Sequence, residues 1–98
     1  MAQQQPPQGQ QIQVAFPDQM KGGVYSNNAF ISHTKEEFIM DFMMIGPNAG
    51  AVTARVITSP GHMKRIILAL QDNVRKYEEK FGRISEAEEP GKGHFGFN

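Results

Sequence analysis

The sequence predicts an α+β fold in which a four-stranded antiparallel β-meander is followed by one long C-terminal α-helix, assembled as an oligomer. Four short apolar segments are separated by turns that contain glycine, proline or polar residues, as in a meander. A longer segment then places apolar residues at alternating steps of four and three, which is the spacing of one helix face. The oligomer is expected because the chain has 98 residues and no cysteine, so neither a large core nor a disulfide can stabilise it.

The first two predicted strands differ in the strength of their pattern. In residues 12–16 every second residue is Ile, Val or Phe, and Pro17 ends the run. Residues 24–34 form the second strand, but neither of its faces is strongly apolar at the start. We therefore expect an irregular region, or a sheet edge, around Asn27 and Asn28.

The third and fourth predicted strands, residues 37–45 and 51–58, are joined by a glycine-bounded hairpin at residues 46–50. If the hairpin centres on Asn48, the opposed pairs are Ile39 with Ile57, Met40 with Val56, Asp41 with Arg55, Phe42 with Ala54, and Met44 with Val52. A register one residue away would place Asp41 opposite an apolar side chain. The charge pair therefore specifies the register.

The predicted helix extends from Ser59 to Gly82. Ser59 is suited to cap the first free N–H groups, Pro60 to the first helical position, and Gly82 to the conformation that ends a helix. Its apolar side consists of Met63, Ile67, Leu70, Val74, Tyr77 and Phe81. Because almost no linker precedes it, we expect the helix to fold back onto the sheet face that contains Phe38, Met40 and Phe42.

The ends of the chain differ in composition from the middle. Residues 1–11 contain only Gln, Pro and Gly after the first two positions, which predicts a disordered arm. Residues 85–98 are acidic and glycine-rich and are expected to form a flexible tail, which leaves residues 12–84 as one domain. The chain shows neither a signal peptide nor an apolar run that could span a bilayer, so we expect a cytoplasmic protein.

The sheet face opposite the predicted helix is also apolar, and its exposure would exceed the patch that monomers usually show. We therefore expect self-association as a dimer or a tetramer, through the sheet or through the helix. The predicted interface residues are Ile39, Asp41, Met43, Arg55, Ile57, Leu70, Val74 and Tyr77.

The titratable residues show no catalytic or ligand-binding pattern. His33, His62 and His94 have no metal-ligand spacing, and the three Glu-Glu pairs are adjacent, so their side chains diverge. Ten acidic and ten basic residues balance, which argues against nucleic acid and membrane partners. Lys64 and Arg65 beside His62 would suit an anion at the helix start, but a solvated first turn is the simpler interpretation. We expect no enzyme, cofactor or metal.

Three segments resemble a known family: GVYSN at 23–27, EEFIMDF at 36–42, and the ARV…SPGHMKR…YEEKFG segment at 54–82. They are similar to the small prokaryotic proteins of domain-of-unknown-function family 3467, over about residues 22–84. The resemblance implies a fold and no reaction. The matching family positions, without assigned roles, are Phe38, Asp41, Phe42, Arg55, Ser59, Pro60, His62, Lys64, Tyr77 and Phe81. The order of strands and helix also resembles that of SecB-like export chaperones, which bind unfolded chains in apolar grooves.

These observations predict a non-enzymatic scaffold or adaptor that binds itself and another protein. The alternative is a SecB-like holdase that binds unfolded chains through a methionine-rich face.

Overall fold

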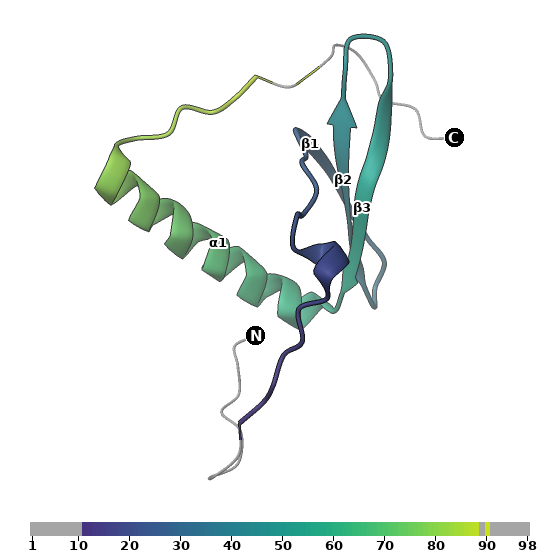
Figure 1. Ribbon diagram of the computed structural model, residues 1–98, viewed down its shortest axis with the longest axis vertical. Helices are drawn as coiled ribbons and strands as arrows, with labels where there is room; N and C mark the ends of the chain where they lie inside the picture. The colour runs from purple at the N-terminus through teal and green to yellow at the C-terminus, as the bar shows by residue number, and fades with distance from the viewer. Residues whose placement is uncertain (1–10, 89, 91–98) are drawn as a thin grey trace.

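The computed structural model is an antiparallel three-stranded sheet followed by one long helix (Figure 1). It describes residues 11–88 and 90. The elements are a 3-10 turn at Asp18–Met20 and then β1 at Asn28–His33, β2 at Phe38–Ile45, β3 at Gly50–Thr58 and α1 at Pro60–Phe81. The strands lie in the order β1-β2-β3, so β2 is central and both other strands are edges. The α+β class and the antiparallel sheet are confirmed. Of the predicted arm, residues 1–11, and the predicted tail, residues 85–98, residues 1–10, 89 and 91–98 lie outside the described residues.

The prediction of a fourth strand at residues 12–16 is wrong. Residues 11–17 have no regular structure, and the side chains of Ile12, Val14 and Phe16 are exposed. An alternating pattern states which face of a strand would be buried, but a strand also needs a free neighbouring backbone to pair with. The chain that would offer this pairing, residues 24–27, is itself not a strand.

The irregularity expected near Asn27 is confirmed, and it delays the start of β1 to Asn28. The Asn27 side chain replaces a backbone pair: its Nδ2 donates to the Ile45 carbonyl, and the Ile45 N–H donates to its Oδ1, both at 2.9 Å. The Ser26 hydroxyl donates to the Met43 carbonyl at 3.1 Å. Side chains therefore satisfy the last backbone groups of β2, where a longer β1 would otherwise have paired.

The predicted hairpin register is confirmed over the first half of β2 and wrong beyond it. The confirmed pairs are Ile39 with Ile57, Met40 with Val56, Asp41 with Arg55, and Phe42 with Ala54. After Phe42 a bulge leaves Thr53 as an extra residue on β3, so Met44 pairs with Ala51 and not with Val52. The Thr53 hydroxyl donates to the Phe42 carbonyl at 3.1 Å, which stabilises the bulge.

The helix begins and ends where the sequence predicts. Ser59 accepts a hydrogen bond from the His62 N–H at 3.2 Å, and Pro60 occupies the first helical position. At the other end Gly82 has φ 102°, which few residues other than glycine adopt, and its N–H donates to the Glu78 carbonyl at 3.0 Å.

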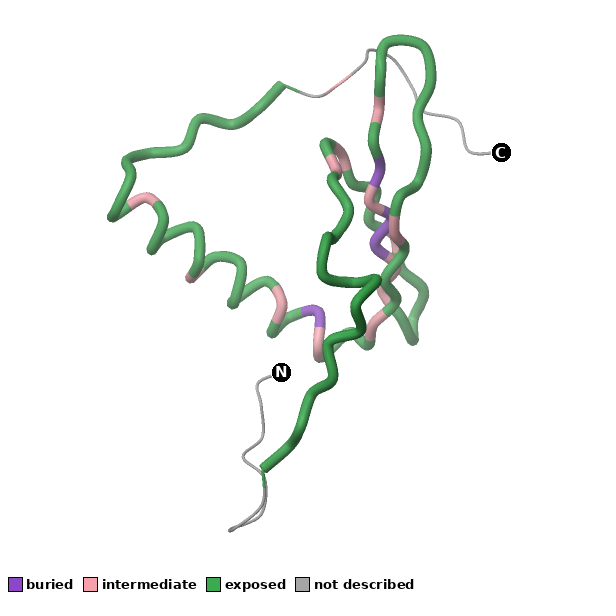
Figure 2. The backbone as a smooth tube through the Cα atoms, in the orientation of Figure 1, coloured by how far each residue is buried: buried purple, intermediate pink, exposed green. Residues whose placement is uncertain are grey.

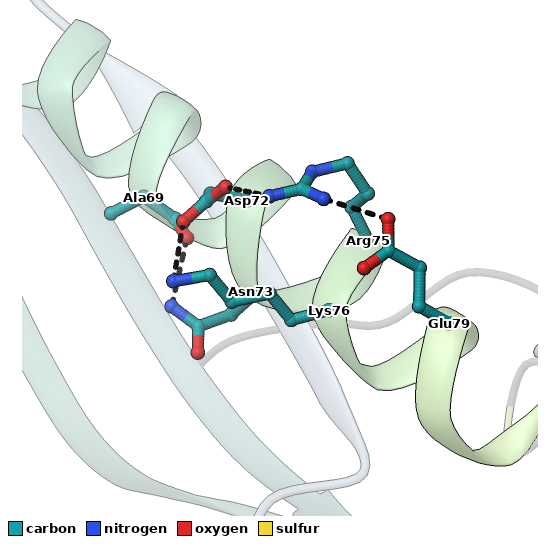
Figure 3. Close-up of polar contacts among 6 residues, drawn as sticks. All are labelled: Ala69, Asp72, Asn73, Arg75, Lys76 and Glu79. Carbon is teal, nitrogen blue, oxygen red and sulfur yellow. Dashed lines mark hydrogen bonds and ion pairs between the residues drawn. The ribbon is translucent and has the colours of Figure 1, made fainter.

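The polar side of α1 is a network of short ion pairs (Figure 3). Asp72 binds Arg75 at 2.8 Å and Lys76 at 3.0 Å, and Arg75 also binds Glu79 at 2.8 Å. These contacts hold the pKa of Asp72 below its usual value, chiefly through the hydrogen bond from Arg75. This side of the helix is therefore suited to water.

The helix does not cover the sheet, contrary to the sequence-based expectation. From the end of β3 it runs away from the strands, and its C-terminal end lies far from them (Figure 1). Ser59 alone connects β3 to α1, whereas connections between a strand and a helix that packs on it usually have 2–6 residues. Within α1 the side chain of Met63 is buried, and the apolar positions after it are not (Figure 2).

Candidate functional site

The sheet has one face without any charged side chain, which we call the Met40 face. Cross-strand partners share a face, so this face is defined by the pairs around Met40 in the middle of β2. Its residues are Ala29, Ile31, His33, Phe38, Met40, Phe42, Met44, Ala51, Ala54, Val56 and Thr58. Met40 is buried by its neighbours, but Ile31 and Val56 on either side of it are 49% and 45% exposed. The Met40 face is thus an open apolar surface.

The opposite face, which we call the Asp41 face, has an ion pair at its centre. It consists of Asn28, Phe30, Ser32, Ile39, Asp41, Met43, Ile45, Val52, Arg55 and Ile57. Arg55 binds Asp41 with two parallel contacts, Nε to Oδ1 at 2.6 Å and Nη2 to Oδ2 at 2.9 Å. The Asp41 side chain is 7% exposed and that of Arg55 is 61% exposed, so the guanidinium covers the carboxylate.

The ion pair changes the pKa of both partners. The hydrogen bond from Arg55 lowers the pKa of Asp41 below its usual value, although burial acts in the opposite direction. The same hydrogen bond raises the pKa of Arg55. Both groups therefore stay ionised at neutral pH, and the pair is satisfied within one chain.

The third apolar surface is the exposed side of α1, which we call the helix seam. Its residues after the first turn are Ile67, Leu70, Val74, Tyr77 and Phe81, all exposed. The rings of Tyr77 and Phe81 lie 4.9 Å apart, and Lys80 Nζ lies 5.3 Å from the centre of the Phe81 ring. With Ile84 the C-terminal half of the seam lines a shallow open groove.

The structure divides the predicted interface residues into two separate groups. One group lies together on the Asp41 face: Ile39, Asp41, Met43, Arg55 and Ile57. The other lies on the helix seam: Leu70, Val74 and Tyr77. Met43 is only 3% exposed, so it supports the sheet and offers little surface to a partner, whereas Ile57 is 52% exposed.

Sequence reasoning missed the Met40 face as a candidate surface. Met44 and Val56 share the face of Phe38, Met40 and Phe42, which was expected to lie under the helix of the same chain, and both are exposed. The signal that would have found them is the length of the connection: Ser59 alone separates the strand pattern from Pro60 at the helix start.

The polar groups of the described residues do not converge on a ligand. Among residues 11–88 and 90, no three His, Cys, Asp or Glu side chains lie close enough to hold a metal ion, and no buried side-chain nitrogen or oxygen lacks a hydrogen-bond partner. At the helix start, His62 Nδ1 lies 3.0 Å from Arg65 Nη2, and the His62 N–H already binds Ser59. His94 lies outside the described residues. That the protein is not an enzyme stays a prediction.

Within the described part of the chain, no helix is both long enough and apolar enough to cross a membrane.

Comparison with known proteins identifies a family and no individual relative. The model of a family described as "Protein of unknown function (DUF3467)" matches residues 1–86. No curated protein and no solved structure matches the chain. The resemblance to family 3467 is confirmed, and the resemblance to SecB-like chaperones has no support.

Proposed function

The chain belongs to the DUF3467 family of proteins of unknown function, and we propose that it is a non-enzymatic, homo-oligomeric protein-interaction module. In this proposal it acts as a scaffold or adaptor in the cytoplasm of a prokaryotic cell, and it binds both a second copy of itself and another protein.

The observation that supports this proposal is how little apolar surface one chain buries. Among the described residues the buried apolar side chains are Met40, Met43 and Met63. A small domain that folds alone buries roughly 60% of the surface of its chain, and monomers rarely expose apolar patches larger than a few hundred Å². Here both sheet faces and the helix seam are open, so other polypeptide surfaces are needed to cover them.

The number of open surfaces favours two kinds of partner. A two-fold dimer brings the same patch of two copies into one interface. It therefore closes some of the three surfaces and leaves at least one for a different protein. A module with one surface for itself and one for a partner acts as an adaptor.

A holdase would be expected to present its methionines together on an exposed surface. Met40, Met43 and Met63 are buried, and Met44 is the exposed methionine of the sheet. The methionine-rich face expected from the sequence is therefore not open as one surface. The holdase enters the experiment below as one of its outcomes.

A pull-down of the tagged full chain from native cytosol, with the captured proteins identified by mass spectrometry, tests the proposal. Light scattering after size-exclusion chromatography measures whether the mass is at least twice the 10.9 kDa of one chain. The variant Ile57→Asp places a charge on the exposed part of the Asp41 face. Asn48→Asp, which makes the same charge change in the exposed β2–β3 loop, is the matched control.

We expect the chain to be an oligomer and to capture one stoichiometric partner. Ile57→Asp should lose this partner, and Asn48→Asp should keep it. If the chain instead captures many unrelated unfolded proteins and Ile57→Asp captures none of them, the holdase would replace the adaptor as the proposed function. A monomeric chain that captures no protein would overturn the proposal.

A further inference from the structure

We propose that two copies of this chain form a two-fold dimer by exchanging their helices, so that α1 of one copy packs on the Met40 face of the other. This inference rests on the proposed self-association and names the surfaces that carry it. The Asp41 face stays outside the exchanged contact. Of the predicted interface residues, Leu70, Val74 and Tyr77 on the helix belong to this dimer contact. Those on the Asp41 face are assigned to the contact with the other protein.

The junction between β3 and α1 keeps the helix away from its own sheet. Ser59 is extended, with φ −76° and ψ 156°, and is the single residue between the two elements. Two hydrogen bonds join it to the first turn of the helix: its hydroxyl accepts from the His62 N–H at 3.2 Å, and its carbonyl accepts from the Met63 N–H at 3.0 Å. Pro60 restricts the next φ angle. A stiff connection this short cannot reverse the chain over its own strand, and short hinges of this kind favour exchange between copies.

The helix seam and the Met40 face match in length. A helix of 22 residues is about 33 Å long, and the strands of the Met40 face, with 8 and 9 residues, extend over about 26 to 31 Å. A helix laid along the sheet would therefore place its apolar residues over the whole of β2 and β3.

The two surfaces also match in chemistry. The Met40 face carries no Lys, Arg, Asp or Glu, and its one titratable residue, His33, lies at the end of β1. On α1 helical spacing places Asp72 and Arg75 on the side away from the seam, and Lys76, whose side chain also lines the seam groove, binds Asp72 through its ammonium group. The contact is thus mainly apolar against apolar, and Lys76 and Lys80, which also line the seam groove, have long side chains that can keep their ammonium groups in water.

Two-fold symmetry closes both surfaces at once. The exchange covers two seams and two Met40 faces in each dimer, whereas a helix-on-helix dimer would leave both Met40 faces exposed. The exchanged dimer removes the larger part of the apolar surface from water and so is the arrangement that the hydrophobic effect favours.

Cross-linking between two differently tagged full-length chains tests the exchange, and the absence of cysteine makes every introduced thiol unique. One chain carries Val56→Cys on the Met40 face, with Ile31→Cys as its replacement should it fail to fold. The other carries Leu70→Cys on the seam. The control, Ala69→Cys, lies one residue away, which is about 100° around the helix from Leu70 (Figure 3). The chains are unfolded together, refolded as a mixture and treated with a short bis-maleimide.

We expect a cross-link between the two tags with Leu70→Cys, several-fold stronger than with Ala69→Cys. A double variant, Val56→Cys with Leu70→Cys on one chain, should form cross-linked dimers. Links between two seams alone, or between two sheets alone, would overturn the exchange and leave self-association standing. Links within one chain, in a protein that stays monomeric, would overturn both.

Lengthening the junction is the second test. Insertion of Gly-Ser-Gly-Ser between Thr58 and Ser59 lets α1 return to its own sheet, so the mass should fall from dimer to monomer while the helical circular dichroism is kept. The same insertion between Asn48 and Ala49, in the β2–β3 loop, should leave the dimer intact. A dimer that survives the junction insertion, with its thiol cross-links unchanged, contradicts the role of the short connection.

Discussion

The two faces of the sheet are formed by the same three strands but differ in how their side chains are shielded from water. The Asp41 face has a polar centre that is satisfied within the chain, because Arg55 covers Asp41 with two hydrogen bonds. The Met40 face has no such group, and Ile31 and Val56 are open to water on either side of Met40. A face with a solvated charge can bind a partner and release it, whereas a predominantly apolar face without such a charge needs a permanent cover.

Placing one charge on each face gives the largest expected contrast. Val56 and Ile57 are neighbours on β3, are similarly exposed, and lie on opposite faces. Val56→Asp would bury an unpaired carboxylate under the partner helix, so we expect it to weaken the dimer by about 2 kcal/mol or more, which is roughly 30-fold or more in the dissociation constant. Ile57→Asp should stay dimeric. Analytical ultracentrifugation measures both, and equal dissociation constants would mean that the faces do not differ.

Removing one partner of the Asp41–Arg55 ion pair should lower the Tm by an amount that depends on which partner is removed. Arg55→Ala removes both the two hydrogen bonds and the cover of the Asp41 carboxylate, which is 7% exposed when Arg55 is present, whereas Asp41→Ala leaves an arginine that is largely in water. We therefore expect Arg55→Ala to lower the Tm by several degrees and Asp41→Ala to lower it less. Thermal unfolding at pH 7 makes the comparison, with Lys64→Ala on the exposed helix surface as a control. The reverse order would show that Arg55 does not stabilise Asp41 in the folded chain.

The same pair predicts a dependence on acid. The pKa of Asp41 in the folded chain lies below its unfolded value of 3.8, so its contribution to stability is fully present above that value and is lost as pH falls through the lower folded pKa. We expect a constant contribution from pH 7 to 5 and a loss below about pH 4. Asp41→Asn should lack this part of the acid dependence, while Asp72→Asn, which removes a different lowered pKa on α1, should retain it.

The smallest expected effect concerns the bulge that assigns residues to the two faces. The hydrogen bond from Thr53 to the Phe42 carbonyl holds the extra residue of β3 in place. Thr53→Val keeps the shape and removes this bond, so we expect a loss of about 1 kcal/mol in the free energy of unfolding. Denaturant titration measures this loss. Cross-strand NMR contacts should still pair Met44 with Ala51, and a shift to Val52 would show that the hydroxyl determines the register.

Residues 12–16 show that an alternating apolar pattern does not by itself predict a strand. They alternate as regularly as β3 does, yet they form no strand, because alternation says nothing about which backbone is available to pair. The register of β2 with β3 was predictable up to Phe42, since the Asp41–Arg55 pair and a short hairpin left few alternatives. The bulge after Phe42 was not, because the residue pattern of β3 does not mark which residue is left unpaired.

The candidate surfaces were predictable only in part. Leu70, Val74 and Tyr77 were identified as interface residues because helical spacing alone places them on one side. The Met40 face was missed, since exposure depends on where α1 lies and not on the strand pattern.

The sequence by itself determined the local features of this protein: both ends of the helix, the central hairpin, the charge pair and the family. Each depends on residues close together in the chain or on one short turn. Only the tertiary structure decided the number of strands, the position of the bulge and the separation of α1 from the sheet. These depend on which surfaces can reach one another, and a connection one residue long limits what the helix of a single chain can cover.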